Sequence, residues 1–468
     1  HELVRMESEG HNLVMREDHV QTLLHRTGGL PLAIIRTIAR MAWRGSSVET
    51  ELQHLEDPDN EIYDFCFSKT IALIQPGDGF LLFMSLAIFA ADVSREALGF
   101  VAGFGSDVLT RDEGLSDLEV LSLCHKNQDC FGIEPLTRTQ ALRELGAHPN
   151  FKAEACERWV KWYLNFTARY GGRDGLEMHL RYDYLEQDWN NVLAVLNWCI
   201  NQGRYDDLLI LWNNVRDFTH IYGFWADRLN LLDWLVVEAN NRLDYPTVVQ
   251  TMYDRAFTLT LTGPTTRLEE ADALLQRCWT LRHYAPPALQ ARVAALTASL
   301  YIKYRKLIEA HQWLDTGEAI LRASKLEPIE LARERTSLLY DRGENWLLMG
   351  EYTKAQETFE DMLEQGKTSG WQRSIAYAEN WLAYTALFQK NADVSKQYME
   401  HGWTVASRIK EKRLTAYFKR TFAYYYYEIA QQKEAFRWAE DALDTFERLG
   451  MLPDTREMQE FIERLKVN

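Results

Sequence analysis

A repeated spacing of about 40 residues in the C-terminal half most restricts what this chain can fold into. Small residues recur at intervals of 39, 45, 40 and 40, at Ala271, Ala310, Ala355, Ser395 and Ala435. Each occupies the packing position of the second helix of a helix pair. Such a pair cannot bury its apolar face alone, so successive pairs must stack and share a core. The spacing therefore predicts an α-solenoid.

The clearest unit is "RGENWLLMGEYTKAQETFEDML", which covers residues 342–363. Gly343 stands where the first helix must approach its neighbour closely, Gly350 and Tyr352 form the turn, and Ala355, Phe359 and Met362 line the inner face of the second helix. This unit resembles the longer form of the tetratricopeptide repeat. Ala298, Ala383 and Ala423 occupy the same small-residue slot in neighbouring units, and weaker helix pairs precede them at 201–212 and 221–235.

Composition supports a helical, globular chain. The 468 residues are 46% hydrophobic and 26% charged, with only 25 glycines and 11 prolines to interrupt helices. The net charge of −16 argues against a general binder of nucleic acid or of anionic membranes, because phosphate binding needs a basic surface. The longest apolar run, 80–91, is too short to span a bilayer. Six cysteines without a CxxC pair suit reduced thiols, so we expect a cytoplasmic protein.

Residues 59–150 show a different pattern. Helices are expected within 79–89, 92–103 and 115–127, the second of them with Ser94 as N-cap, and "CFGIEPL" at 130–136 follows as a small hairpin or wing. Three helices and a short wing predict a winged-helix domain.

The N-terminal stretch "TGGLPLAIIRTIARMAWRG" covers 27–45. Gly28 and Gly29 can end one helix, and Pro31 can start the next at its first turn. The acidic turn "EDPDNE" at 56–61 closes this helical segment.

In this order the segments resemble the C-terminal part of a STAND-class, NB-ARC-like signalling ATPase. The motif Gly-Leu-Pro-Leu-Ala, typical of the lid helix of that class, stands without a mismatch at 29–33. The stretch 81–103 resembles the start of its winged helix, and 183–211 resembles the segment that leads into its repeats. The resemblance covers nearly the whole chain.

The resemblance implies a mainly α fold with a winged-helix domain followed by a tetratricopeptide-type α-solenoid. It divides the chain into a helical lid remnant (1–58), the winged helix (59–150), a helical linker with degenerate repeats (151–245) and the repeat superhelix (246–468). Leu30, Pro31 and Glu134 would be the nucleotide-contacting residues. Glu134 occupies the slot that often holds a phosphate-sensing histidine, and its carboxylate would repel a phosphate.

A P-loop, GxxxxGK[ST], is absent from the sequence. The nearest fragment, "QGKTSG" at 365–370, has Asp361 in place of the leading glycine and follows a repeat helix rather than a strand. We therefore expect no ATP hydrolysis by this chain. ADP or ATP is expected only with a nucleotide-binding domain outside this sequence.

No catalytic constellation is recognisable. Cys124, His125 and Cys130 are clustered, but three ligands without a fourth at the usual spacing favour structural roles over a metal site. No catalytic residue and no metal are predicted.

The concave face of the repeats is the better candidate site, because tyrosine and arginine are favoured at recognition surfaces. The positions expected on it are Tyr340, Glu344, Tyr377, Asn380, Tyr384, Tyr417, Arg420, Tyr424 and Tyr427. The alternative is that these rings pack between repeats. If the binding assignment holds, alanine at both Tyr424 and Tyr427 should abolish partner capture and leave melting nearly unchanged.

The first functional hypothesis is a regulatory and sensing fragment. Its repeats would bind a protein, peptide or small-molecule signal, and the winged helix would relay that occupancy to a nucleotide-binding domain, in a full-length protein that can oligomerise. The alternative is a constitutive tetratricopeptide scaffold. DNA binding by the winged helix is disfavoured, because the expected recognition helix carries Asp112, Glu113, Asp117 and Glu119, which phosphates would repel.

Overall fold

The computed structural model describes residues 1–54, 62–175 and 178–467, and the chain divides into two compact units. Unit 1 comprises residues 1–166 and 188–198, and unit 2 comprises 167–187 and 199–468. In the described residues almost all regular structure is α-helical. No helix of this part is long and apolar enough to cross a membrane.

Unit 1 begins with a group of short helices around α3. They are α1 (Glu2–Gly10), α2 (Glu17–Arg26), α3 (Pro31–Arg44), α4 (Val48–His54) and α5 (Ile62–Ile74). Gly28 and Gly29 have φ values of 59° and 70° after the end of α2, and Pro31 is the first residue of α3, as the sequence predicts. Ile34 and Ile38 of α3 form part of a small core with Val4 and Leu23.

The next part of unit 1 adds a three-stranded sheet to four helices. Its elements are α6 (Asp78–Leu86), β1 (Val93–Ser94), α7 (Arg95–Ala102), α8 (Val108–Val120), β2 (His125–Asn127), β3 (Cys130–Gly132) and α9 (Pro135–Ala147). The sheet has the order β1-β3-β2 with both pairs antiparallel, and Phe131 of β3 lies opposite Val93. The Ser94 Oγ accepts a hydrogen bond from the Ala97 amide at 3.2 Å, which confirms the expected N-cap of α7. The assignment to the winged-helix class stays a prediction.

Of the three expected domain boundaries, one lies in or beside undescribed residues and two fall in the first turns of helices. The boundary between residues 58 and 59, with the acidic turn at 56–61, lies in or at the edge of the undescribed stretch 55–61. The boundary at 150 falls in the first turn of α10 (Pro149–Tyr170), and the boundary at 245 falls in the first turn of α15 (Tyr245–Thr262). The domain division stays a prediction.

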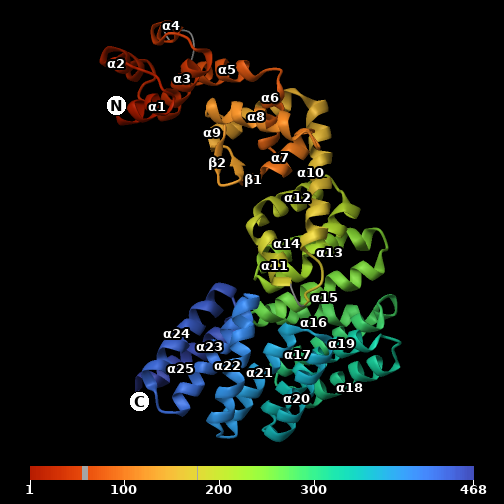
Figure 1. Ribbon diagram of the computed structural model, residues 1–468. Helices are drawn as coiled ribbons and strands as arrows, with labels where there is room; N and C mark the ends of the chain where they lie inside the picture. Colours follow the sequence, from red (N-terminus) through yellow and green to blue (C-terminus); the bar gives the residue numbers. More distant parts are fainter. Residues whose placement is uncertain (55–61, 176–177, 468) are drawn as a thin grey trace. The chain divides into compact units, whose positions relative to one another are not determined.

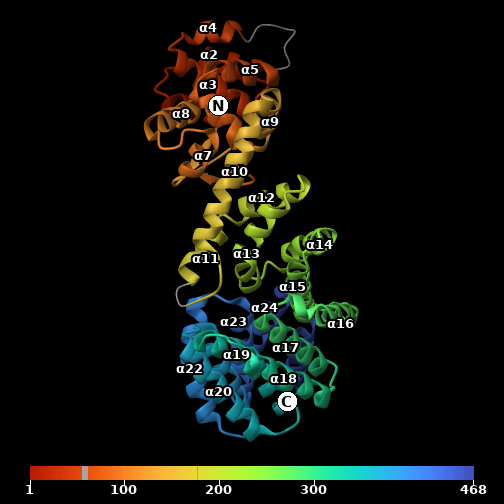
Figure 2. The same ribbon diagram turned by 90° about the vertical axis from the view of Figure 1, so that its right-hand side faces the viewer.

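Unit 2 is built from helices that follow one another in chain order (Figures 1 and 2). After α10 and α15, given above, its elements are α11 (Met178–Gln187), α12 (Trp189–Asn201), α13 (Tyr205–Ile221), α14 (Trp225–Asn241), α16 (Thr265–Thr280), the 3-10 helix η1 (Arg282–Tyr284), α17 (Pro287–Lys303), α18 (Leu307–Ala323), α19 (Pro328–Leu348), α20 (Tyr352–Ser369), α21 (Gln372–Phe388), α22 (Ala392–Ile409), α23 (Lys412–Glu428), α24 (Gln432–Leu449) and α25 (Leu452–Val467). Helices α10 and α12 contribute residues to both units.

The repeat prediction is confirmed in the packing of α15 to α24. These helices form antiparallel pairs, α15 with α16 through α23 with α24, whose succession Figure 1 shows from green to blue. The five predicted small residues Ala271, Ala310, Ala355, Ser395 and Ala435 lie on the second helices of the pairs and are fully buried. A larger side chain there would push neighbouring helices apart. The mainly α fold with an α-solenoid is therefore as expected.

Candidate binding cavity

A cavity of about 210 Å³ opens on the first helices of the repeat pairs. Its walls come mainly from α15, α17, α19, α21 and α23, which we call the first-helix face. The second helix α20 adds Met362, and the terminal helix α25 adds Asp454. A cavity of about 150 Å³ accepts a benzene ring, so this one is large enough for a ligand side chain.

Helical spacing explains why each wall presents several polar side chains. Tyr340 and Glu344 are four residues apart on α19, and so are Arg373 and Tyr377 on α21. Residues separated by one turn lie on the same face of a helix. The faces that α19, α21 and α23 turn toward the cavity therefore each carry a tyrosine together with a charged group.

Aromatic rings form one side of the cavity. Tyr340 makes edge contacts with Tyr377 and Trp381, at ring-centroid distances of 5.7 and 5.5 Å. Tyr377 in turn contacts Tyr417 at 6.3 Å, and the guanidinium of Arg413 lies 5.2 Å from the Tyr377 ring centroid. These contacts hold the rings in place, because each ring has a neighbour on the next first helix.

Glu411, the N-cap residue of α23, accepts hydrogen bonds from side chains in the wall of the cavity. Its buried carboxylate accepts hydrogen bonds from Arg373 at 2.6 and 2.9 Å and from the Tyr377 hydroxyl at 2.7 Å. Burial raises the pKa of Glu411, but the Arg373 charge and these hydrogen bonds outweigh burial, so the pKa lies below its ordinary value. Arg413 Nε donates to the Tyr377 hydroxyl at 2.8 Å. The two arginines are therefore already engaged.

The lining of the cavity also includes carboxylates. Asp341, Glu344 and Asp454 line it, and burial raises the pKa of each carboxyl above its ordinary value. Asp454 has an ion-pair partner in Arg420 at 3.2 Å. The lining of the cavity thus combines engaged arginines with carboxylates, and it also includes Lys303.

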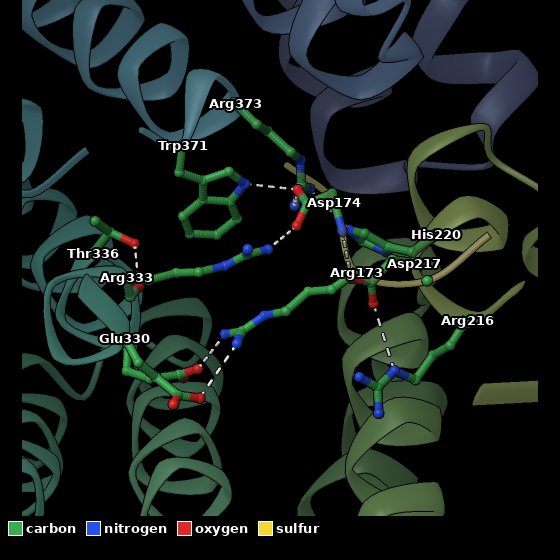
Figure 3. A network of polar contacts seen from close by, with 12 residues as sticks. Arg173, Asp174, Arg216, Asp217, His220, Glu330, Arg333, Thr336, Trp371 and Arg373 are labelled. Carbon is green, nitrogen blue, oxygen red and sulfur yellow. Dashed lines mark hydrogen bonds and ion pairs between the residues drawn. The ribbon is translucent and has the colours of Figure 1, made fainter. Parts of the chain in front are cut away.

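A second cavity of about 130 Å³ lies beside the first and shares Trp371 and Arg373 with it. The segment 171–175, between α10 and α11, enters this second cavity (Figure 3). The Asp174 carboxylate accepts hydrogen bonds from Arg333 and, at 2.7 Å, from the indole Nε1 of Trp371. Arg173 donates to Glu334 at 2.6 Å. A segment far from the repeats in sequence is therefore anchored on α19 and α21.

Glycine makes this anchoring geometrically feasible. A Cβ at Gly171 would lie 2.2 Å from the Asn214 carbonyl oxygen, and the Gly172 amide donates to that oxygen at 2.6 Å. The Tyr182 hydroxyl donates to the Gly172 carbonyl, also at 2.6 Å. The backbone of the segment can approach α13 so closely only because residue 171 has no side chain.

The structure brings five of the nine predicted concave-face residues together around the first cavity. They are Tyr340, Glu344, Tyr377, Tyr417 and Arg420. Whether they bind a ligand stays a prediction. Asp174, Trp371, Arg373 and Glu411 were not predicted. Only Arg373 had a signal in the sequence, since it precedes Tyr377 by one helical turn.

The other four predicted residues do not line this cavity, and their assignment to a binding face stays a prediction. The Asn380 side-chain oxygen accepts a hydrogen bond from Thr421 at 2.9 Å and is buried between α21 and α23. Tyr384 packs on Tyr424 with ring centroids 5.7 Å apart. Tyr424 and Tyr427 both contact Phe461 of α25, at 4.6 and 5.6 Å between ring centroids. The terminal helix α25, which the repeat pattern did not anticipate, thus contacts Tyr424 and Tyr427, although Tyr427 is still 43% exposed.

The three residues implied to contact nucleotide lie in unit 1 at exposed positions. Leu30 caps the start of α3 and Pro31 is its first residue. Glu134 precedes α9, and its carboxylate lies 3.5 Å from Nδ1 of His125. Nucleotide contact by these residues stays a prediction.

Two disfavoured sites can also be described. Asp112 of α8 forms ion pairs with Arg95 at 3.2 Å and with Arg111 at 2.7 Å. Burial raises the pKa of Cys124 to about 12, which disfavours the thiolate that a metal site needs. In the described residues, no group of three metal-ligating side chains converges.

The fold defines a class of protein, an α-solenoid of tetratricopeptide type preceded by a smaller helical unit. Comparison with solved structures finds the same fold in a signal transduction ATPase with numerous domains (STAND) that has a tetratricopeptide repeat sensor, from Pyrococcus horikoshii. The TM-score is 0.54 at 14% identity over 92% of this chain, which spans 62% of that protein's length. The predicted resemblance is thus confirmed at the level of the fold.

Further similarities are more distant. The quorum sensor NprR from B. thuringiensis in its apo form matches 70% of this chain and 93% of its own, with a TM-score of 0.40 and 15% identity. A Rap protein complexed with competence and sporulation factor matches 67% of this chain and 98% of its own, with a TM-score of 0.39 and 12% identity. No family model and no curated protein sequence matches this chain.

Proposed function

We propose that this chain is the sensing and regulatory part of a STAND-type switch. In this proposal the first cavity, on the first-helix face, binds a peptide, protein segment or small-molecule signal. The observation that carries the proposal is a cavity built from five consecutive first helices and lined by tyrosines and charged groups. Concave sites with a few convergent polar groups are where ligands usually bind. The solved structure with the same fold is named as a protein with a tetratricopeptide repeat sensor, which supports this proposal.

The relay is the second part of the proposal. Trp371 and Arg373 line the ligand cavity, and on their other side they face Asp174. Asp174 follows the end of α10 by four residues, and α10 begins at Pro149 in unit 1. A ligand that moves Trp371 would change the hold on Asp174 and thereby bias α10 and the winged-helix region.

Binding rather than catalysis is the proposed role of this chain. ATP or ADP would be bound by a nucleotide-binding domain outside this sequence, and ligand and nucleotide would then affect each other's affinity reciprocally. The predicted cytoplasmic location is part of the same proposal.

The test uses a variant that fills the cavity. Ser337 lines both cavities from α19, so Ser337→Tyr should block them, whereas Thr368→Tyr on the exposed side of α20 is the matched control. Each purified protein is incubated with the fraction below ~3 kDa of a source-cell extract, desalted and denatured, and the released compounds are identified by mass spectrometry. We expect a compound from wild type and Thr368→Tyr that is missing from Ser337→Tyr.

Two results would contradict the sensor proposal. Release of no compound, or equal release from all three proteins, would show that the cavity holds no signal from this extract fraction. The constitutive scaffold would then be the better description.

A further inference from the structure

Two carboxylates in the cavity lack a cationic partner. Glu344 and Asp341 are three residues apart on α19 and line the same cavity. In the described residues, Glu344 makes no hydrogen bond and no ion pair, and Asp341 is hydrogen bonded to the Ser299 hydroxyl. Asp341 is buried and Glu344 is partly exposed, and charged groups shielded from water usually have an opposite charge beside them.

The nearby cations form no ion pair with Glu344 or Asp341, although Lys303 lines the same cavity and its charge acts to lower the pKa of both carboxyls. Arg420 is engaged by Asp454 at 3.2 Å and by Glu457 at 3.0 Å. Lys303 and Arg305, at and beyond the end of α17, are exposed, and no ion pair of either is found in the described part of the chain. Within the described part of the chain, neither Glu344 nor Asp341 therefore has a cation at ion-pair distance.

A separate observation also points to a ligand. Tyr417 lines the cavity, its side chain is only 8% exposed, and its hydroxyl has no hydrogen-bond partner among the described residues. A tyrosine hydroxyl that lines a cavity and has no protein partner can form a hydrogen bond with a ligand. Tyr340, whose ring stands next to that of Tyr377, likewise has no described partner for its hydroxyl.

We infer that the cavity selects a ligand that presents a cationic nitrogen, an ammonium or a guanidinium group, to Glu344 and Asp341. This inference rests on the proposed function. A cation would offset the desolvation of both carboxylates, and the faces of the tyrosine rings add a favourable environment for it. An anionic group at the same place would meet two carboxylates and is rejected.

The raised pKa values agree with this reading. Burial first, and then the charge of Glu344, raises the pKa of Asp341, and burial raises that of Glu344. A bound cation would lower both. The same chemistry is offered by a lysine or arginine side chain of a peptide and by a small free amine, so the experiment includes both sources.

The probes are four pools of acetylated and amidated pentapeptides with mixed uncharged flanks and a fixed central residue. The central residues are lysine, arginine, norleucine and glutamate, and agmatine and cadaverine are the free amines. The purified chain is equilibrated with each probe, and the retained fraction is measured by mass spectrometry after rapid desalting. We expect at least about tenfold greater retention of the lysine or arginine pool, or of an amine, than of the norleucine pool.

Substitutions localise the effect. Glu344→Gln keeps the shape but removes the charge, and we expect it to abolish the preference while leaving the melting temperature unchanged or slightly raised, because a partly buried charge without an ion-pair partner is lost. Tyr417→Phe should lower retention about fivefold through loss of one hydrogen bond. Glu309→Gln, at an exposed position on α18, is the matched control and should change neither property.

Each result decides the inference. The inference is supported if the protein retains the lysine or arginine pool, or an amine, and if Glu344→Gln loses that retention. Stronger retention of the peptides or of the amines then identifies which of the two is the source of the cationic nitrogen. Equal retention of the norleucine or glutamate pool, no retention of any cationic probe, or an unchanged preference in Glu344→Gln overturns it. If the extract compound excluded by Ser337→Tyr carries no cationic nitrogen, the inference fails while the sensor proposal stands.

Discussion

Asp174 and Trp371 are 197 residues apart in sequence, yet the indole Nε1 of Trp371 donates a 2.7 Å hydrogen bond to the buried Asp174 carboxylate. The same carboxylate is held by Arg333 of α19 (Figure 3). The contact ties the segment that follows α10 to a residue in the wall of the first cavity. Asp174 follows the last residue of α10 by four positions.

Removal of this carboxylate should destabilise unit 2. Asp174→Ala leaves the Arg333 charge and the Trp371 N–H without their acceptor, and breaking a buried pair in this way costs about 3–5 kcal/mol. Urea unfolding followed by tryptophan fluorescence measures the loss. Asp393→Ala at an exposed position on α22 should cost less than about 0.5 kcal/mol. Similar unfolding midpoints for the two variants would show that Asp174 is not an anchor.

The repeat packing depends on Gly343. A Cβ at this position would lie 2.3 Å from the Phe359 ring of α20, so Gly343→Ala must push the two helices apart. We expect a loss of about 1–3 kcal/mol in thermal or chemical unfolding. Gly146→Ala, in an exposed turn of α9 with nothing within 4 Å, should be neutral or stabilising by up to about 1 kcal/mol. The opposite order would contradict the packing described for α19 and α20.

The rings of Tyr424 and Tyr427 should act on stability, contrary to the expectation from the sequence. Both contact Phe461, and the Tyr424 hydroxyl donates to Glu457 at 2.7 Å. Replacing both by alanine should lower the free energy of unfolding by about 2–4 kcal/mol, because the packing of α25 is lost. Melting curves measure this, with Ile308→Ala, which is 68% exposed, as the control. An unchanged melting temperature of the double variant would instead support the assignment of these two rings to the binding face.

Asp188 of unit 1 should give stability a specific pH dependence. Burial raises its pKa to about 6, although hydrogen bonds from Asn191 and Tyr163 lower it in part. The folded protein then holds this proton more tightly than the unfolded chain does. The stabilisation is fully present below pH ~4 and is lost as the pH rises through ~6, by about 2–3 kcal/mol.

Asp188→Asn cannot titrate, so it should lack this loss. Urea unfolding at pH 4, 5, 6 and 7 measures the free energy of unfolding of both proteins. From pH 4 to pH 7 the wild type should lose more of this free energy than the variant does. The variant also loses part of the hydrogen bonding of the carboxylate, which shifts its curve by a constant amount. Parallel curves from pH 4 to 7 would contradict the raised pKa.

Local patterns were sufficient to predict many of the elements, but the helix expected within 115–127 was wrong in its bounds, because α8 covers Val108–Val120 and His125–Asn127 pair with β3 as strand β2. Pro31 and Ser94 mark the starts of α3 and α7, and the small residues from Ala271 to Ala435 predict the second helices of the repeat pairs. These features depend on backbone preferences and on a repeating contact between neighbours in the chain. The faces of Tyr340, Glu344 and Tyr377 follow from the same helical period, which is why these residues do line the cavity.

Only the tertiary structure decided which residues distant in sequence come into contact. Asp174 contacts Trp371 because the segment that follows α10 lies against the repeat helices. Tyr424 packs against Phe461 of α25, a contact that the helical period of the sequence does not specify. Helical spacing specifies which side chains share a face but not what packs on that face. The sequence by itself therefore determined the solenoid and its repeating faces, whereas only the folded chain decided that Glu344 lacks a partner and that Asp174 has several, because pairing depends on contacts between residues distant in sequence.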